Sequence, residues 1–456
     1  MRNISRKAFD IYVGFTRNSA IFSIADEVRW YANEDTTLFA VILFDFTDKD
    51  YNAVFLKRDQ DRKIKYVDNA ISFNSISEAE DWINITESKV NAGKIQLTPE
   101  IDSRIGVDLF RIIVKESRLH PYFRAVNEIS AHVAAKKLIN EITPHFVDVD
   151  GNYIEQFQTS GFNSRLWELY LFCYFHEEGL IINRKHEAPD FMLSNGEISV
   201  AVEAVIAENK TPYLNIDERR LPFDVDVEKE MENKLPLIYG SPLNTKLTHT
   251  TKDKGLHYWE YEHTKNIPFV IAIADFHDVF AMTMSTTALI NYLYGLKHSH
   301  YYEKNGDLVI VTEKIESHIK EDTGVKIPSG FFFQPGTENI SAIIHSASGT
   351  LSKFDRIGKQ CGFDTNNTIM QRIVTVYNPE PNADKPLVVE YFVDENCEET
   401  WGEGVSVYHN PNALIPLPSD FLSSAAHHFL EGGKIVTENV KAHVYSSFTF
   451  LFSEKP

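Results

Sequence analysis

In the first part of the chain, residues 1–148, apolar side chains occur with two different spacings, one typical of strands and one typical of a helix. Residues 36–46 (TTLFAVILFDF) and 51–59 (YNAVFLKRD) are rich in apolar and β-branched side chains, a pattern typical of strands. Over residues 121–143 apolar side chains recur at steps of three and four, which predicts a helix that the following proline ends. We therefore expect an N-terminal α+β region with several strands.

The middle part, residues 149–325, is predicted to be a layered α/β core. A strong helix is expected over residues 163–180 (NSRLWELYLFCYFHEEGL), with Asn163 or Ser164 as its N-cap. Short strands are expected to follow at 180–183, 189–193 and 198–207. The nearly uninterrupted apolar segment 266–276 (NIPFVIAIADF) is typical of a strand covered on both faces. This order of helix and strands favours α/β layering.

The last part, residues 326–456, has short apolar runs broken by glycine and proline, so we expect a β-rich region packed on the core. The chain has 456 residues, of which 43% are hydrophobic, enough for two or three domains. No run of about 18 apolar residues occurs, so no membrane-spanning helix is expected. The N-terminus lacks the apolar run of a secretory signal. Three scattered cysteines favour a reducing, cytoplasmic setting.

Two acidic residues interrupt the apolar pattern of the middle part. Asp190 follows Pro189 at the head of one expected strand, and Glu203 lies inside the next. A buried carboxylate costs several kcal/mol unless it is paired, neutralised or bound to a metal ion. A hairpin of this length would bring Asp190 and Glu203 together, and a helix packed against it would add Glu168. Three oxygen ligands with waters suit Mg²⁺ or Mn²⁺.

Simpler explanations exist for each of these acids. A Pro-Asp pair at a strand start is often only a turn device. Glu203 could be paired with Arg184 or Lys185, and Glu168 could be an ordinary exposed residue of a helix. A metal site requires the three carboxylates to lie close together, whereas these alternatives do not.

The order of helix-borne Glu168, Pro189-Asp190 and Glu203 resembles the pattern of the PD-(D/E)XK nuclease family. The resemblance covers about residues 160–290. It implies an α/β, restriction-endonuclease-like core, in which a mixed sheet is flanked by helices. It also implies metal-dependent hydrolysis of phosphodiester bonds in DNA or RNA, with Glu168, Asp190 and Glu203 as ligands of Mg²⁺ or Mn²⁺. Such a metal polarises a phosphate oxygen and activates water.

The chain departs from the family pattern at one position. Where the family has a lysine two residues after the strand glutamate, this sequence has Val205. That lysine normally orients the attacking water or stabilises the transition state, and in some relatives it comes from a neighbouring element. Lys210 and Lys246 are candidates, and Lys246 is favoured because SPLNTKL looks like the start of a helix facing the sheet. If neither reaches the metal, a weak or inactive enzyme is expected. The missing lysine and the acidic charge favour a catalytically inactive binding or scaffold protein as the alternative, and a sensor whose N- or C-terminal portion binds a small ligand is a third.

A nucleic-acid substrate requires a local basic patch, because the net charge of the whole chain is −20. Tyr258 and Trp259 are candidates for stacking on bases. A role in defence against foreign nucleic acid, acting as a homo-oligomer or with a partner protein, extends the family resemblance. Basic residues in or near the expected core are Arg184, Lys185, Arg219, Arg220, Lys234, Lys246, Lys252 and Lys254.

Two further segments carry candidate chemistry. The segment DFHD ends the apolar strand, where ligands of α/β sheets often bind, so His277 is a candidate substrate contact. Lys353, Arg356 and Lys359, in SASGTLSKFDRIGKQCG, form a candidate phosphate site, although the Walker pattern is absent. A strand-end loop and solvated surface charges are the simpler explanations.

Overall fold

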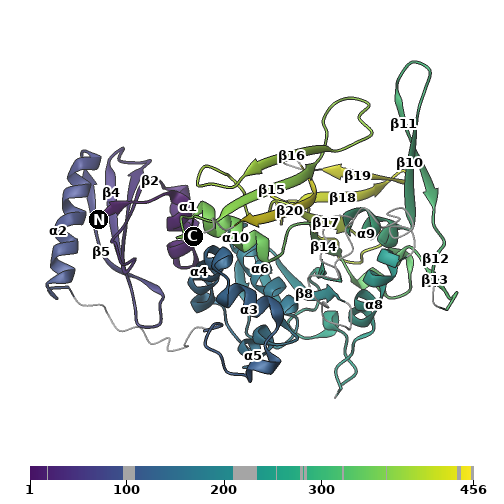
Figure 1. The fold of residues 1–456 in the computed structure, drawn as a ribbon, viewed down its shortest axis with the longest axis horizontal. Helices are drawn as coiled ribbons and strands as arrows, with labels where there is room; N and C mark the ends of the chain where they lie inside the picture. Colours follow the sequence, from purple (N-terminus) through teal and green to yellow (C-terminus); the bar gives the residue numbers. More distant parts are fainter. Residues whose placement is uncertain are drawn as a thin grey trace.

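The computed structural model describes residues 1–17, 19–95, 108–208, 234–252, 254–277, 281, 285–320, 323–365, 367–438 and 443–452. Figure 1 shows a sheet formed by the N-terminal strands at one end of the molecule and a body of mixed sheet and helices. A hairpin of β10 (Leu296–Tyr302) and β11 (Leu308–Lys314) projects from the body. Within those ranges, no helix is both long and apolar enough to cross a bilayer.

The N-terminal sheet is antiparallel, and its five strands lie side by side in chain order. Helix α2 (Ile76–Asn91) covers one face of this sheet with Ala79 and Ile83, and α1 (Arg6–Val13) covers the other with Phe9. The expected strands at 36–46 and 51–59 are present. The strands are β1 (Arg2–Asn3), β2 (Ala25–Ala32), β3 (Leu38–Asp45), β4 (Tyr51–Arg58) and β5 (Ile64–Phe73).

The helix predicted over 121–143 is two helices. They are α3 (Pro121–Glu128) and α4 (Val133–Ile142), and Ile129 between them has extended backbone angles. The break lets the apolar sides of both helices pack into the same core, and His132 at the start of α4 contacts Asp355 at 2.8 Å. Helical spacing does not reveal such a break, because both halves keep the same apolar rhythm.

The body is built on an eight-stranded mixed sheet in the order β19-β18-β17-β14-β9-β8-β7-β6. The pairs β8–β9, β9–β14 and β17–β18 are parallel, and the other neighbours are antiparallel. Its strands are β6 (Ile181–Asn183), β7 (Phe191–Ser194), β8 (Ser199–Ala207), β9 (Phe269–Asp275), β14 (Ala342–Ser346), β17 (Val405–His409), β18 (Ala426–Glu431) and β19 (Lys434–Glu438). Strands from the middle and last parts of the chain thus form one layer, and no break in the sheet occurs near residue 326.

Helices cover both faces of this sheet, which makes the fold mixed α/β (Figure 1). On one face, α6 (Phe162–Glu177) packs against residues such as Val202 of β8 and Val270 of β9. On the other face, α8 (Leu235–Thr248) and α9 (Ser285–Tyr294) pack against the alternate residues, including Ala201 and Ile271. β9 is buried along its whole length, as its apolar sequence predicts.

Helix α6 begins earlier than predicted. Its N-cap is Gly161, whereas the amide of Asn163, one of the two predicted caps, donates to Glu208 Oε1 at 2.6 Å. The helix ends as expected before Gly179, which has a positive φ of 75°.

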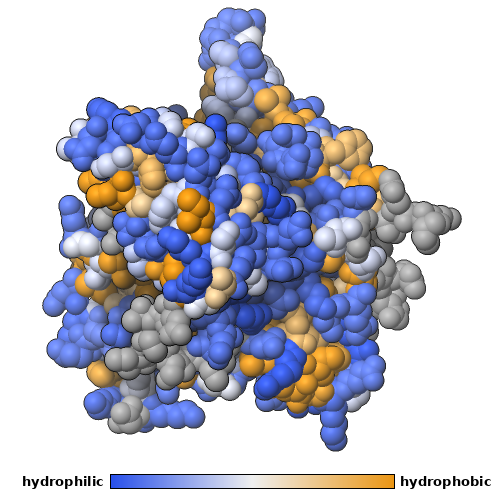
Figure 2. All heavy atoms as spheres, turned by 90° about the vertical axis from the view of Figure 1, so that its left-hand side faces the viewer, coloured by the Kyte–Doolittle hydropathy of each residue, from blue (hydrophilic) through white to orange (hydrophobic). Residues whose placement is uncertain are grey.

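The remaining elements lie around the large sheet. Helix α10 (Leu351–Gln360) packs against α4, and β15 (Ile369–Val376) is the middle strand of a small antiparallel sheet. Seen from the side of the N-terminal sheet, the surface is mainly hydrophilic, with hydrophobic side chains in small separate groups (Figure 2). The other elements are α5 (Tyr153–Gln158), β12 (Ser317–Ile319), β13 (Lys326–Pro328), β16 (Leu387–Phe392) and β20 (Val444–Phe452).

Candidate functional site

Asp190 and Glu203 meet at the open end of the β7–β8 hairpin. The two strands pair with Phe191 opposite Val202, and the same register sets Asp190 opposite Glu203. The Asp190 N–H donates to Glu203 Oε2 at 3.2 Å, and the Ala204 N–H donates to Asp190 Oδ2 at 2.8 Å. The predicted hairpin therefore brings these two acidic residues together, and backbone hydrogen bonds hold both carboxylates.

Lys246 brings a cation to this pair. It lies in the last turn of α8, and its Nζ is 2.5 Å from Glu203 Oε1. The ammonium also lies 5.7 Å from the centre of the Tyr258 ring, and the Tyr258 hydroxyl hydrogen bonds to the Glu203 carboxylate. Glu203 is thus paired with Lys246 and not with Arg184. Of the two lysines predicted to replace the missing one, Lys246 reaches the carboxylates and Lys210 lies outside the described residues.

Glu168 comes from the opposite side of the sheet. Side chains alternate along a strand, and Val202 belongs to the core under α6 whereas Ala201 belongs to the core under α8. By this alternation Glu203 points to the side of α8, where Lys246 lies. Glu168 belongs to α6 on the other side, which explains why it does not join the hydrogen-bonded pair.

Two arginines hold Glu168 in place. Arg165 Nη1 lies 2.6 Å from Glu168 Oε1, and Arg184 Nη2 lies 3.5 Å from Glu168 Oε2. The Arg184 guanidinium sits 4.1 Å from the ring centre of Phe146 and 4.8 Å from that of Phe191. Its Nε and Nη1 are buried without a hydrogen-bond partner among the described residues. Glu168 is therefore a buried, ion-paired residue and not the exposed helix residue of the simpler explanation.

Two of the three acidic residues have pKa values well above that of a free glutamate. The pKa of Glu203 is raised to about 7, first by burial and second by the Asp190 carboxylate, while Lys246 opposes the rise. Burial also raises the pKa of Glu168 to about 8, with the Asp190 carboxylate as the second cause and Arg184 and Arg165 in opposition. Both shifts mean that burial, together with repulsion from the Asp190 carboxylate, outweighs the effect of the nearby cations on these pKa values. A bound cation would lower both pKa values.

Two of the three predicted metal ligands, Asp190 and Glu203, are placed to bind a hard cation together. Among the residues that the structure describes, no three His, Cys, Asp or Glu side chains are grouped so that they could hold a metal ion. Asp190 and Glu203 remain as two adjacent oxygen donors, and Mg²⁺ commonly binds through one or two carboxylates while keeping several waters. The pair fits Mg²⁺ or Mn²⁺ in that manner, with Glu168 outside the set.

Sequence reasoning missed two neighbours of the site. Arg165 stands three residues before Glu168 on one helix, a spacing at which opposite charges meet, so a local signal for this pair existed. Tyr258 was expected to stack on bases, but it is buried and its ring packs on Phe269 with centroids 5.6 Å apart. Its contact with Glu203 has no local signal in the sequence. Of the two aromatic residues predicted to stack on bases, the half-buried Trp259 is therefore the one that a base can reach.

The candidate phosphate segment has a structural role instead. Lys353 Nζ lies 2.8 Å from Glu399 Oε1, and Arg356 binds both oxygens of the same carboxylate at 2.7 Å. All three side chains are at most 1% exposed. Both cations are buried and ion-paired with Glu399, so they are not exposed to a ligand. His277 is also engaged, since its Nδ1 lies 2.5 Å from Asp275 Oδ1.

The predicted basic patch is only partly described. Lys185, Lys252 and Lys254 are exposed, whereas Arg184 is buried against Glu168. Arg219 and Arg220 lie outside the described residues.

No protein-family model matches the chain, and no curated protein or solved structure is significantly similar to it. Function must therefore be inferred from the site itself.

Proposed function

We propose that this protein is a metal-dependent nuclease that hydrolyses phosphodiester bonds of DNA or RNA on a restriction-endonuclease-like core. One observation carries the proposal. The Lys246 ammonium, 2.5 Å from Glu203, stands beside two adjacent carboxylates at the open end of a hairpin in a helix-flanked mixed sheet. Lys246 thus reaches from α8 to the carboxylates, and this sequence has Val205 at the position where the family pattern has a lysine.

The residues divide the work as follows. Asp190 and Glu203 would hold Mg²⁺ or Mn²⁺, which supplies polarisation of the phosphate and activation of a water molecule. Lys246 orients the attacking water or neutralises charge that develops on the phosphate oxygens. The Ala204 N–H fixes one oxygen of Asp190 so that its other oxygen can face the substrate. Glu168 fixes Arg184 beside the strand that carries the pair.

The proposal is tested by cleavage of a panel of plasmid, linear duplex, single-stranded DNA and structured RNA with Mg²⁺ or Mn²⁺. We expect cleavage by the wild type that EDTA abolishes, and we expect no cleavage by Glu203→Gln or Asp190→Asn. Lys246→Met should lower the rate by about a hundredfold, as loss of a transition-state donor does. Lys304→Met, at the exposed turn of the β10–β11 hairpin, is the matched control and should cleave normally.

An inactive binding protein on the same fold is the second candidate. The direct bond of Lys246 to Glu203 favours it, because the ammonium already neutralises one of the two carboxylates. A folded wild type that binds a nucleic acid but cleaves no substrate with either metal would establish this candidate and contradict hydrolysis. A cytoplasmic location and a role in defence are extensions of the proposal and depend on which substrate is found.

A further inference from the structure

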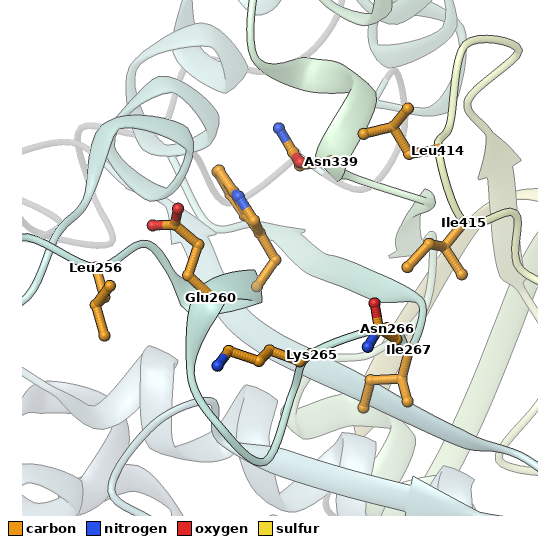
Figure 3. Close-up of a pocket in the computed structure, with 9 residues that line it drawn as sticks. Leu256, Glu260, Lys265, Asn266, Ile267, Asn339, Leu414 and Ile415 are labelled. Atoms are coloured by element: carbon orange, nitrogen blue, oxygen red, sulfur yellow. The ribbon is translucent and has the colours of Figure 1, made fainter.

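A pocket opens beside the turn Tyr258–Glu260, whose first residue contacts Glu203 of the candidate site. It has a volume of about 460 Å³, within the range of roughly 300–1,000 Å³ that small-ligand pockets occupy. Figure 3 shows Asn339 and Leu414 entering it from one side and Asn266 and Ile267 from the other. The lining residues are Leu256, Trp259, Glu260, Lys265, Asn266, Ile267, Asn339, Leu414 and Ile415.

The pocket and the carboxylate pair share one structural element. This element is the single helical turn η9 (Tyr258–Glu260), in which Tyr258 hydrogen bonds to Glu203 while the next residue, Trp259, lines the pocket. Phe269 at the start of β9 contacts both rings, with centroids 5.6 Å and 5.7 Å away. Adjacent residues of one turn of backbone therefore link the carboxylate pair to the wall of the pocket.

The orientation of the indole is fixed. His257 stacks on Trp259 with ring centroids 4.7 Å apart and an angle of 6° between the planes, and Phe269 packs on it at 59°. A preorganised aromatic surface loses little conformational entropy when a flat ring stacks on it.

The lining favours a flat, uncharged ligand over a phosphate group. Lys265, the cation in the pocket wall, is bound to Glu262 at 2.8 Å, and Glu260 adds a negative charge. The apolar residues supply contact area, and two carboxamides supply hydrogen bonds. The Asn339 amide nitrogen donates to Gly336 O at 3.0 Å, which orients its carboxamide oxygen as an acceptor.

We propose that this pocket binds one unpaired nucleobase of the substrate, next to the phosphate that is cleaved. The proposal rests on the nuclease function proposed above and narrows its substrate to a single strand or to a duplex from which one base is extruded. Trp259 provides the stacking surface, and the two asparagines contact the edge of the base. Stacking on an aromatic side chain is tolerant of sequence, because every base has a π-face.

The test removes one base from the oligonucleotide, the indole of Trp259 from the protein, or both. Single-stranded oligonucleotides that lack one base at each position in turn are cleaved by the wild type and by Trp259→Ala. We expect one position at which removal of the base lowers kcat/KM of the wild type roughly tenfold to a hundredfold, the range that base stacking gives. At that position Trp259→Ala should lose activity on the intact oligonucleotide but lose little more when the base is absent.

A second variant guards against misfolding of Trp259→Ala. Leu414 is 69% exposed, so Leu414→Glu should leave the fold intact while it places a charge in the pocket. It should reproduce the effect of Trp259→Ala. Ile310→Glu, on the projecting β11 strand and 53% exposed, is the matched control and should behave like the wild type.

The binding step is measured without catalysis, so that it does not depend on the nuclease function. Glu203→Gln is titrated with single-stranded oligonucleotides that carry 2-aminopurine, whose fluorescence is quenched on stacking. Quenching that Leu414→Glu abolishes supports the base pocket even if no cleavage is found, and only the nuclease function then fails. Cleavage with equal effects of base removal in the wild type and both pocket variants overturns the pocket proposal alone, as does the absence of quenching.

Discussion

Lys246 Nζ and Glu203 Oε1 lie 2.5 Å apart, although 43 residues separate them in the chain. The contact joins the last turn of α8 to the middle of β8 across the face of the sheet that α8 covers. This contact places a positive charge beside the two acidic residues of the β7–β8 hairpin.

Replacing Lys246 should affect chemistry more than binding. In Lys246→Met the aliphatic stem remains and the charge is lost, so we expect kcat to fall about a hundredfold with a smaller change in KM. Lys246→Arg keeps the charge and should recover part of the rate. Single-turnover cleavage measures the chemical step directly. Equal rates for Lys246→Met and the wild type would remove Lys246 from the reaction.

The same contact marks where sequence reasoning was sufficient and where it was not. The strands β6, β7 and β8 and the meeting of Asp190 with Glu203 were predicted from short apolar runs and the length of a hairpin, which are local properties. Lys246 became a candidate through the family resemblance and because SPLNTKL was expected to start a helix facing the sheet. The segment is instead the C-terminal half of α8, which does cover the sheet. The pairing of Lys246 with Glu203 depends on how α8 packs on the sheet, and no local pattern encodes that.

Two features of the structure depend on contacts that are distant in the sequence. Glu168 was expected beside the other acidic residues, but α6 covers the opposite face of the sheet and Arg165 and Arg184 engage its carboxylate. The last part of the chain was predicted as a region packed on the core, whereas its strand β14 pairs with β9 inside the large sheet. The order of strands in a sheet depends on contacts between distant parts of the chain. The pattern of apolar residues predicts that a strand exists but not which strand it pairs with.

Glu399 should be essential for stability. Its carboxylate, 1% exposed, binds Lys353 and Arg356, and Arg372 lies 3.5 Å away. Glu399→Gln leaves these buried cations without their shared partner, a kind of change that costs about 3–5 kcal/mol. Urea denaturation measures the loss. The neighbouring and exposed Glu398 provides the control, because Glu398→Gln should change the free energy of unfolding by less than about 0.5 kcal/mol.

Buried histidines should make the protein unstable in acid. His345 is fully buried, and burial lowers its pKa from 6.5 to about 4; its two ring nitrogens have no hydrogen-bond partner among the described residues. Burial lowers the pKa of His443 to about 4 as well. A folded pKa below the unfolded value means that the contribution to stability is complete above about pH 6.5 and is lost as the pH falls towards 4.

His345→Leu separates this effect from general acid denaturation. The variant removes one group that must stay neutral in the folded state, so its thermal midpoint should fall less than that of the wild type between about pH 6.5 and pH 4. His300→Leu, at an exposed position of the β10–β11 hairpin, should follow the wild-type curve. Parallel curves for His345→Leu and the wild type would show that protonation of His345 does not drive acid unfolding.

The carboxylates of the candidate site should produce the opposite dependence on pH. The folded pKa values of Glu203, about 7, and Glu168, about 8, lie above the ordinary value of 4.5. The folded state therefore holds these protons more tightly than the unfolded state. Without metal, the stability from these two groups is complete below about pH 4.5 and is lost as the pH rises through 7 and 8.

Metal binding should reverse that loss, because Mg²⁺ or Mn²⁺ requires the deprotonated carboxylates. We expect Mn²⁺ to raise the thermal midpoint more at about pH 8 than at about pH 6, and binding should release protons at the lower pH. Glu203→Gln should abolish the rise at both pH values, whereas Glu168→Gln should keep it, since Glu168 lies on the other side of the sheet. If instead Glu168→Gln abolishes the rise and Glu203→Gln keeps it, the metal is bound at the α6 side and the pair of Asp190 and Glu203 is not the metal site.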